Sequence, residues 1–238
     1  MSAPLDPAPS PPTDERGAAL ALLPVAATID YYALPGWLQS QPLVQFAPQL
    51  IGYLAFALWA SRNDSILNRI GFQRSQWRQG LRFGTVTGTI LGCVNSLVIL
   101  SLVPSLGWDI TFLKDTPHAR VPVQIMLPWF IAGIALLVEI NFRGFVLGRL
   151  AVIESALWRG ATFQRLSPFA LLSSALIFAF DPFMLATFQH LHWIAVYDGV
   201  VWGLLWLLTR NLYATIAAHT VEVVIVYSAV RWALLDNG

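Results

Sequence analysis

Charged residues are scarce in this chain. Of its 238 residues only 11% are Asp, Glu, Lys or Arg, whereas soluble domains carry roughly 25%. Hydrophobic residues make up 56%, and the mean hydropathy is +0.62. This composition excludes an ordinary soluble domain and predicts an integral membrane protein, with the lipid bilayer as its first partner. The formal net charge of +1 shows no excess of basic residues, so we expect no nucleic-acid partner.

Cysteine is almost absent, since Cys93 is the single one and lies within an apolar run. One cysteine excludes an intramolecular disulfide and a cysteine-based metal cluster. The sequence also lacks a dense ligand motif such as H-E-x-x-H. We therefore assign no metal ligand and no required cofactor, and the question of a divalent metal stays open.

The first 17 residues are rich in Pro and acidic residues and lack the basic start of a signal peptide, so residues 1–17 are predicted to be a disordered tail.

Residues 18–37 contain two prolines and Asp30 and form either a first span or a helix lying at the interface. The further predicted spans are 42–60, 83–103, 124–147, 168–188, 193–209 and 212–234. The fold class is therefore all-α, a polytopic membrane helix bundle with six or seven transmembrane helices. It is one membrane domain, with N-terminal helices over 18–123 and a helical core over 124–234.

Arginine is concentrated between alternate spans. Residues 62–82 contain five arginines, and the opposite loops contain only Lys114 and Arg120. Further arginines on the same side are Arg149, Arg159, Arg165 and Arg210. The positive-inside rule places these basic loops in the cytosol, with the bacterial inner membrane as the expected location.

The predicted span over residues 124–147 carries an acid and a base four residues apart. Glu139 and Arg143 lie about 40° apart around a helix, so they share one face. Charged groups inside a membrane cost about 2.5–3.5 kcal/mol each and usually face a protein or water-lined interior. Glu139 and His219 both lie roughly 10–12 Å from the arginine-rich ends of their spans, at 1.5 Å per residue. We therefore expect this acid and this imidazole to meet in one cavity, where they could deprotonate water and polarise a carbonyl.

Other polar residues of the predicted spans are Asn141, Asp181, His190, His192, Asp198 and Glu222. Each candidate also has a structural interpretation. The pair Glu139–Arg143 could be an ion pair that orders the bundle, and His219 could be a hydrogen-bonded histidine between helices. Asp181 could hydrate a helix break at Pro182, and Glu222 could pair with an arginine of another helix. Two small-residue patterns, Gly84–Gly88–Gly92 and Gly199–Gly203, are typical of close helix contacts.

The segment 139–144, Glu-Ile-Asn-Phe-Arg-Gly, resembles the E-x-x-F-R-G core of the first motif of the CAAX-protease and bacteriocin-processing family. These are membrane endopeptidases related to type 2 CAAX prenyl proteases. The downstream order G-x-x-x-G at 199–203, T-x-x-L at 209–212 and I-x-x-H at 216–219 is also similar. The resemblance covers about residues 124–230. It implies a helical bundle with a site opening within the membrane, a glutamate-activated water, a histidine pair, and oxyanion stabilisation by histidine and asparagine.

The chain departs from the family pattern at functional positions. Val138 stands where the family has the first of two adjacent glutamates, the one usually assigned to water activation. Val223 stands at the Asn or Asp of the third motif. The second motif, F-x-x-x-H, fits Phe188–His192, with His190 as a near alternative. The segment 178–182 has a better spacing but ends in Pro182 instead of histidine.

The leading hypothesis is a divergent intramembrane endopeptidase that cleaves a membrane-associated protein or peptide. In this hypothesis Glu139 is the general base, Arg143 holds it, and His219 polarises the scissile carbonyl. The assisting residues are His192 or His190, with Glu222 and Asp181 in supporting positions. One alternative is a catalytically inactive relative that acts as a membrane scaffold or immunity-type binding protein. Another is a small transporter subunit, for which a broken helix at Asp181–Pro182 is typical.

Overall fold

The computed structural model describes residues 15–158 and 166–236, and these residues form helices and no strand. The predicted all-α class is confirmed for this part of the chain. Four helical segments are long and apolar enough to cross a membrane: Arg74–Ser105, Ile131–Leu157, Pro182–Thr209 and Leu212–Leu235. Three apolar helices are shorter: Ala18–Ala33, Ala47–Ala60 and Pro168–Ala179. The length and composition of these four helices, counted over the described residues, indicate an integral membrane protein.

The α-helices are α1 (Leu22–Ala33), α2 (Gly36–Gln39), α3 (Pro42–Gln45), α4 (Ala47–Ala60), α5 (Ile66–Ile70), α6 (Trp77–Leu97), α7 (Val103–Ser105), α8 (Pro117–Arg120), α9 (Val123–Ile125), α10 (Ile131–Glu139), α11 (Gly148–Leu157), α12 (Pro168–Ala179), α13 (Pro182–Phe188), α14 (His192–Thr209) and α15 (Leu212–Arg231). Short 3-10 turns are η1 (Ala18–Ala21), η2 (Arg74–Gln76), η4 (Thr111–Asp115) and η7 (Gln189–Leu191). Stretches with the wider π-helical turn are η3 (Val98–Leu102), η5 (Met126–Phe130), η6 (Ile140–Leu147) and η8 (Trp232–Asp236). The stretch η6 joins α10 to α11, so the acid-bearing rod is continuous through Glu139 and Arg143.

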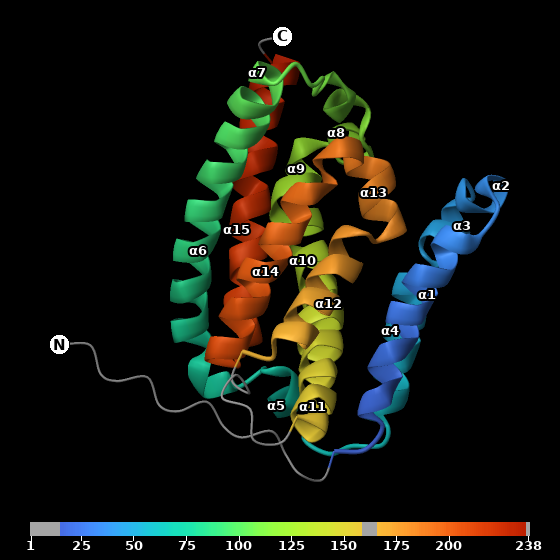
Figure 1. Cartoon of the computed structure of the whole chain (residues 1–238). Coiled ribbons are helices and arrows are strands. Elements are labelled where there is room, and N and C mark those ends of the chain that lie inside the picture. The colour runs from blue at the N-terminus through green and yellow to red at the C-terminus, as the bar shows by residue number, and fades with distance from the viewer. Residues whose placement is uncertain (1–14, 159–165, 237–238) are drawn as a thin grey trace.

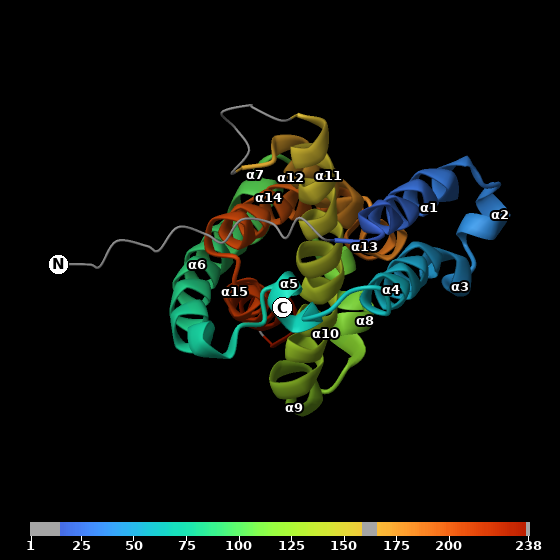
Figure 2. The ribbon, with the colours of Figure 1, turned by 90° about the horizontal axis from the view of Figure 1, so that it is seen from below.

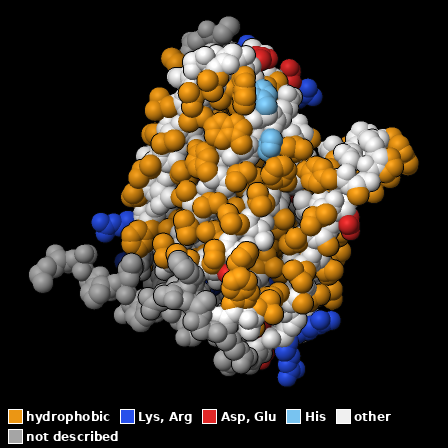
Figure 3. Space-filling view, viewed as in Figure 1, with side chains coloured by type: hydrophobic (Ala, Val, Ile, Leu, Met, Phe, Trp, Pro, Cys, Tyr) orange, Lys and Arg blue, Asp and Glu red, His pale blue; other side chains and the backbone are white. Residues whose placement is uncertain are grey.

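Helices α6, α10, α12, α14 and α15 form a bundle, and α1 and α4 lie as a pair along one side of it (Figures 1 and 2). Hydrophobic side chains cover the middle of the face in Figure 3, while the visible Lys and Arg side chains lie at its margins, at the left edge, at the lower right and near the top. This distribution is what a bilayer requires, since apolar groups meet the hydrocarbon and cations meet the headgroups.

Glycine determines how closely α6 approaches α15. A Cβ atom on Gly84 would overlap the carbonyl oxygen of Ala214, and one on Gly88 would overlap that of Ala218. Without side chains at these positions the two backbones pack together, as the small-residue spacing predicts. This contact brings Asn95, one turn beyond the glycines, against α14 and α15.

The second small-residue pattern positions α14 against α12. A Cβ atom on Gly199 would lie 3.0 Å from the Cα atom of Ala175, and one on Gly203 would overlap the side chain of Leu171. Trp206, one turn further along α14, is buried and donates from Nε1 to the carbonyl of Ile70 at 3.1 Å. Both glycine patterns are therefore packing surfaces.

The predicted span over residues 168–188 is wrong in its boundary. Helix α12 ends at Ala179 and α13 begins at Pro182, and α13 continues through η7 into α14. Asp181 caps α13, because its carboxylate accepts hydrogen bonds from the amides of Phe183 and Met184. Proline at the first helical position and a capping carboxylate together start a new helix here.

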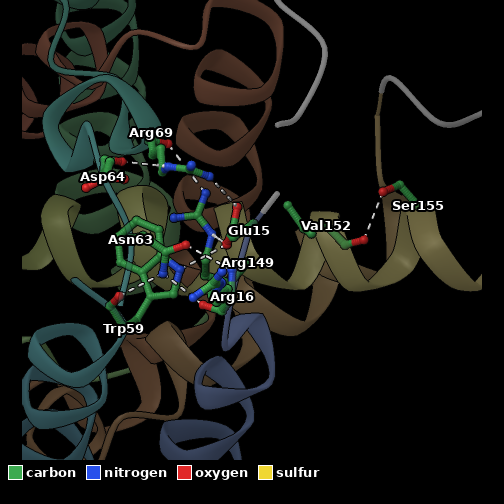
Figure 4. A network of polar contacts seen from close by, with 9 residues as sticks. All are labelled: Glu15, Arg16, Trp59, Asn63, Asp64, Arg69, Arg149, Val152 and Ser155. Atoms are coloured by element: carbon green, nitrogen blue, oxygen red, sulfur yellow. Dashed lines mark hydrogen bonds and ion pairs between the residues drawn. The ribbon is translucent and has the colours of Figure 1, made fainter. Parts of the chain in front are cut away.

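The arginine-rich end contains a buried ion cluster (Figure 4). Arg149 was expected in a basic loop, but it lies in α11 and is 3% exposed. Its Nε atom lies 2.5 Å from Oε1 of Glu15, which also accepts a hydrogen bond from Trp59 Nε1 at 3.0 Å. The described end of the predicted tail is therefore anchored by Glu15. Residues 1–14, Arg159 and Arg165 lie outside the described residues.

Candidate functional site

Glu139 and His219 meet between α10 and α15, as the matched depths in the sequence predict. His219 Nδ1 lies 3.0 Å from Glu139 Oε1. Glu139 has no exposed surface, and the His219 side chain is 9% exposed. The carboxylate thus contacts the imidazole from the buried side and leaves Nε2 of His219 as the ring nitrogen for other partners.

Arg143 compensates the charge of Glu139. Its Nη1 atom lies 3.4 Å from Glu139 Oε1, and the whole guanidinium is buried. The aromatic rings of Phe178 and Trp202 flank this cation at 4.7 and 5.1 Å. Trp202 also stacks on the His219 ring, with centroids 4.2 Å apart. The predicted shared face of Glu139 and Arg143 is confirmed, and two aromatic rings from α12 and α14 hold the arginine and the histidine in place.

The π-helical stretch η6 supplies Arg143, and a neighbouring helix supports it. Ser174 of α12 donates to the carbonyl of Phe142 at 3.0 Å. Asn141 of the same stretch is buried against Gly52 of α4, where a Cβ atom would lie 2.8 Å from the Asn141 amide. A wide helical turn frees backbone groups, which other side chains then satisfy, and such turns are frequent at functional sites.

A cavity of about 220 Å³ adjoins His219. Its wall is mostly apolar and comes from α6, α10, α12, α13, α14, α15 and the segment 113–119. Its main polar lining residues are Asn95, Lys114, His118, His192, Asp198, His219, Glu222 and Arg231. Neither Glu139 nor Arg143 lines it. This volume is large enough for several water molecules, and His219 is the member of the Glu139–Arg143–His219 group that lines it.

The cavity runs away from the arginine-rich end. Its lining residues on α15 and η8 extend from His219 to Leu235, about 24 Å at 1.5 Å per residue. The segment 113–119, which comprises the end of η4 and most of α8, also lines it, at the end opposite the basic segments. The matched depths of Glu139 and His219 thus predicted their contact correctly. The open space next to His219, however, extends toward the end opposite the arginines.

Asp198 and Glu222 form an acid pair in this cavity. Asn95 donates from Nδ2 to Glu222 Oε1 at 2.6 Å and to both oxygens of Asp198 at 3.2 Å. All three side chains are at least nine-tenths buried. Glu222 thus interacts with Asn95 and Asp198, while the carboxylate that contacts His219 is Glu139.

The two remaining histidine candidates separate in space. His192 lines the cavity, and its Nδ1 atom lies 2.7 Å from the carbonyl of Gln189. His190 does not line it, because its ring packs between Trp108 and Phe112 at 5.5 and 5.2 Å. His192 is therefore the only one of these two that shares a cavity with His219.

Asp181 also lies away from the cavity lining. Besides capping α13, it accepts a hydrogen bond from Gln49 of α4 at 3.0 Å. Its contacts are those of a residue that joins two helices, and no contact links it to Glu139 or His219.

Val138 and Val223 both line the cavity. These are the two positions at which the chain departs from the family's acid and amide. Val138 precedes Glu139 by one residue and therefore points about 100° away from it around the helix. The structure thus places both departures on the cavity wall, where each valine presents methyl groups.

The sequence analysis listed Asp198 among the polar residues of the predicted spans but gave it no role in the site, and it missed Asn95 altogether. Asn95 follows the Gly84–Gly88–Gly92 stripe, and this position on a packing face was the available signal. Among the described residues, no group of three or more His, Cys, Asp or Glu side chains is arranged to hold a metal ion.

Comparison of the chain with protein families, with characterised proteins and with solved structures finds no match.

Proposed function

We propose that this protein is an intramembrane endopeptidase, a divergent relative of the CAAX-protease and bacteriocin-processing family. The observation that carries the proposal is the buried Glu139 carboxylate 3.0 Å from Nδ1 of a histidine that faces a cavity. An imidazole held from behind by a carboxylate is the arrangement by which proteases orient a base. The substrate is a membrane-associated protein or peptide, because the wall of the cavity is largely apolar.

In this mechanism His219 is the general base. Nε2 of His219 takes a proton from a cavity water as the water attacks the scissile carbonyl carbon, and Glu139 stabilises the resulting imidazolium. Glu139 itself is a positioning residue, because a base must reach its water and Glu139 has no exposed surface. This division of roles differs from the sequence hypothesis, in which Glu139 is the base. Arg143 compensates the Glu139 charge and holds its orientation.

His192 is a second polar group on the cavity wall and could contact the substrate beyond the scissile bond. We assign it an assisting role and give His190 none, because His190 lies among aromatic rings outside the cavity.

The proposed setting is the bacterial inner membrane, with the arginine-rich end in the cytosol. In this orientation the cavity extends toward the outer leaflet. With the four long helices, α4 and α12 would make six membrane helices, and α1 would be the seventh if it crosses the bilayer instead of lying at the interface.

The test is hydrolysis by the purified full chain in vesicles of phosphatidylethanolamine and phosphatidylglycerol, using a pool of fluorogenic hydrophobic peptides. His219→Ala should reduce cleavage by about 10²–10⁴-fold, the usual contribution of a general base. His190→Ala is the matched control and should cleave as the wild type does. If the His219→Ala variant cleaves at the wild-type rate, His219 is not the general base.

Glu139→Gln sharpens the same test. It keeps the size of the side chain but removes the charge that stabilises the imidazolium, so cleavage should fall while the protein stays folded. If cleavage by this variant matches the wild type, Glu139 has no positioning role.

A catalytically inactive relative that binds a membrane partner is the second candidate function. Val138 and Val223 favour it, because they give the cavity wall methyl groups at two positions where the family carries polar side chains. This candidate predicts no cleavage of any peptide in the pool by the wild type. It also predicts that His219→Ala changes only the retention of a co-purifying membrane protein.

A further inference from the structure

The buried ionisable groups around His219 carry an excess of negative charge. The buried groups that face one another here are Glu139, Arg143, Asp198, His219 and Glu222, with the Tyr197 hydroxyl beside the two acids. Three carboxyl groups and one arginine leave two negative charges unbalanced when His219 is neutral. Protonation of His219 would still leave one. A membrane interior does not tolerate such an excess, because charges removed from water cost several kcal/mol unless paired.

The geometry of the pair shows how the excess is relieved. Asn95 Nδ2 reaches the carboxyl groups of both Glu222 and Asp198, which brings the two acids side by side. Two oxygens of Asp198 and one of Glu222 thus lie within 3.2 Å of a single nitrogen atom. Two ionised carboxylates held this close together in a membrane interior repel each other, and one shared proton removes that repulsion.

Four buried polar atoms near this pair have no hydrogen-bond partner: Asn95 Oδ1, Glu222 Oε2, the Tyr197 hydroxyl and Trp202 Nε1. Asn95, Trp202 and Glu222 line the cavity. Because buried polar atoms are normally satisfied, we expect cavity water to bind here.

We propose that Asp198 and Glu222 share one proton and deliver it to the leaving amine of the substrate. This inference rests on the proposed peptidase function and adds its acid. Glu222 follows His219 by three residues on α15, so the two side chains share a face of that helix. Asp198 precedes Trp202 by one turn on α14, and Trp202 stacks on His219. The proposed base and the proposed acid therefore line one cavity.

The step balances as follows. Water gives a proton to His219 Nε2 and forms a C–O bond to the carbonyl carbon. The C–N bond then breaks, and the amine nitrogen takes the proton shared by Asp198 and Glu222. The proton on His219 returns to the acid pair through cavity water, so that one water is consumed and an acid and an amine are released. Asn95 acts on this step as a positioning residue, because its Nδ2 atom holds both carboxyl groups.

A leaving-group comparison tests the acid. The purified full chain in vesicles is given a hydrophobic fluorogenic peptide and a nitrophenyl ester of the same acyl segment. An amine needs a proton to leave and a nitrophenolate does not. Asp198→Asn and Glu222→Gln should therefore lower the ratio of amide to ester hydrolysis by about 10²-fold or more. His219→Ala should reduce both reactions, and Asp64→Asn, an exposed acid, should change neither.

Infrared difference spectra test the shared proton without any substrate. At neutral pH the wild type should show the C=O band of a protonated carboxylic acid, and Asp198→Asn and Glu222→Gln should each lose it. A band that both variants retain overturns the shared proton. If the wild type cleaves the amide and both variants keep its amide-to-ester ratio, the acid role is overturned. The proposed peptidase function would then still stand. If the wild type hydrolyses neither substrate, the peptidase proposal fails, while the spectra still decide whether the pair holds a proton.

Discussion

Two buried clusters of acids and arginines occupy different parts of this molecule, and they differ in what surrounds them. At the arginine-rich end, Glu15 lies between Arg149 and Arg69, and Trp59 covers Arg149 at 4.2 Å (Figure 4). In the second cluster, the buried Arg143 lies 3.4 Å from Glu139, and the His219 imidazole and two acids, Asp198 and Glu222, line open space.

Burial of an ion pair does not by itself indicate a catalytic role, because the two clusters differ in charge balance and in access to the cavity. The first cluster has more cations than acids, joins the chain's N-terminal segment to α4, α5 and α11, and none of its side chains lines the cavity. The second has more acids than cations, and its unpartnered oxygens lie beside a cavity. This difference supports a structural role for the cluster around Glu15 and is consistent with the chemistry that we propose for the cluster around His219.

The largest stability effect is expected at the arginine-rich end. Arg149→Met removes one partner of a buried pair and leaves Glu15 with a poorly compensated charge. The free energy of unfolding should fall by about 3–5 kcal/mol. Denaturation of the purified protein in detergent measures it, and the exposed Arg62→Met is the matched control. Cleavage per folded molecule should stay at the wild-type level, and a loss there would contradict the separation of the two clusters.

A smaller effect is expected where α6 meets α15. Gly88→Ala forces a Cβ atom into the carbonyl oxygen of Ala218, and overpacking of this kind costs about 1–3 kcal/mol. Because α6 carries Asn95, cleavage should fall together with stability. The control is Gly133→Ala on α10, where a Cβ atom meets nothing within 4 Å. Equal stability of the two variants would mean that close approach of α6 and α15 is not required.

The smallest effect concerns the cavity wall at the end opposite the arginines. Burial lowers the pKa of His118 below its ordinary value of 6.5, because the ring packs against Phe183 and Phe188. The unfolded chain then binds a proton that the folded chain does not, so stability should decrease as the pH falls below about 6.5. Thermal unfolding between pH 7.5 and 5 measures this slope, with the window set by the ordinary histidine pKa of about 6.5. His118→Phe should flatten the slope, and an unchanged slope would exclude His118 as its source.

Local patterns in the sequence predicted several parts of the structure correctly. The spacing of Glu139 and Arg143 predicted their shared face, because helical geometry alone fixes it. The stripe Gly84–Gly88–Gly92 predicted a close helix contact, and the pair Asp181–Pro182 predicted a helix break. Errors occurred where a boundary or an environment depends on distant residues. Arg149 looked like a loop cation, but Glu15 reaches it from a part of the chain far away in sequence.

The sequence by itself determined that this is a helical membrane protein. A chain with so few charges can satisfy its backbone hydrogen bonds in lipid only through helices or a closed barrel. Its long apolar runs favour helices. It also determined which acid and which base share a helix face. Only the tertiary structure decided that Asn95 meets Asp198 and Glu222, which lie 103 and 127 residues further along the chain. Contacts over such separations follow from how helices pack, and packing decides which buried charges are balanced and which face open space.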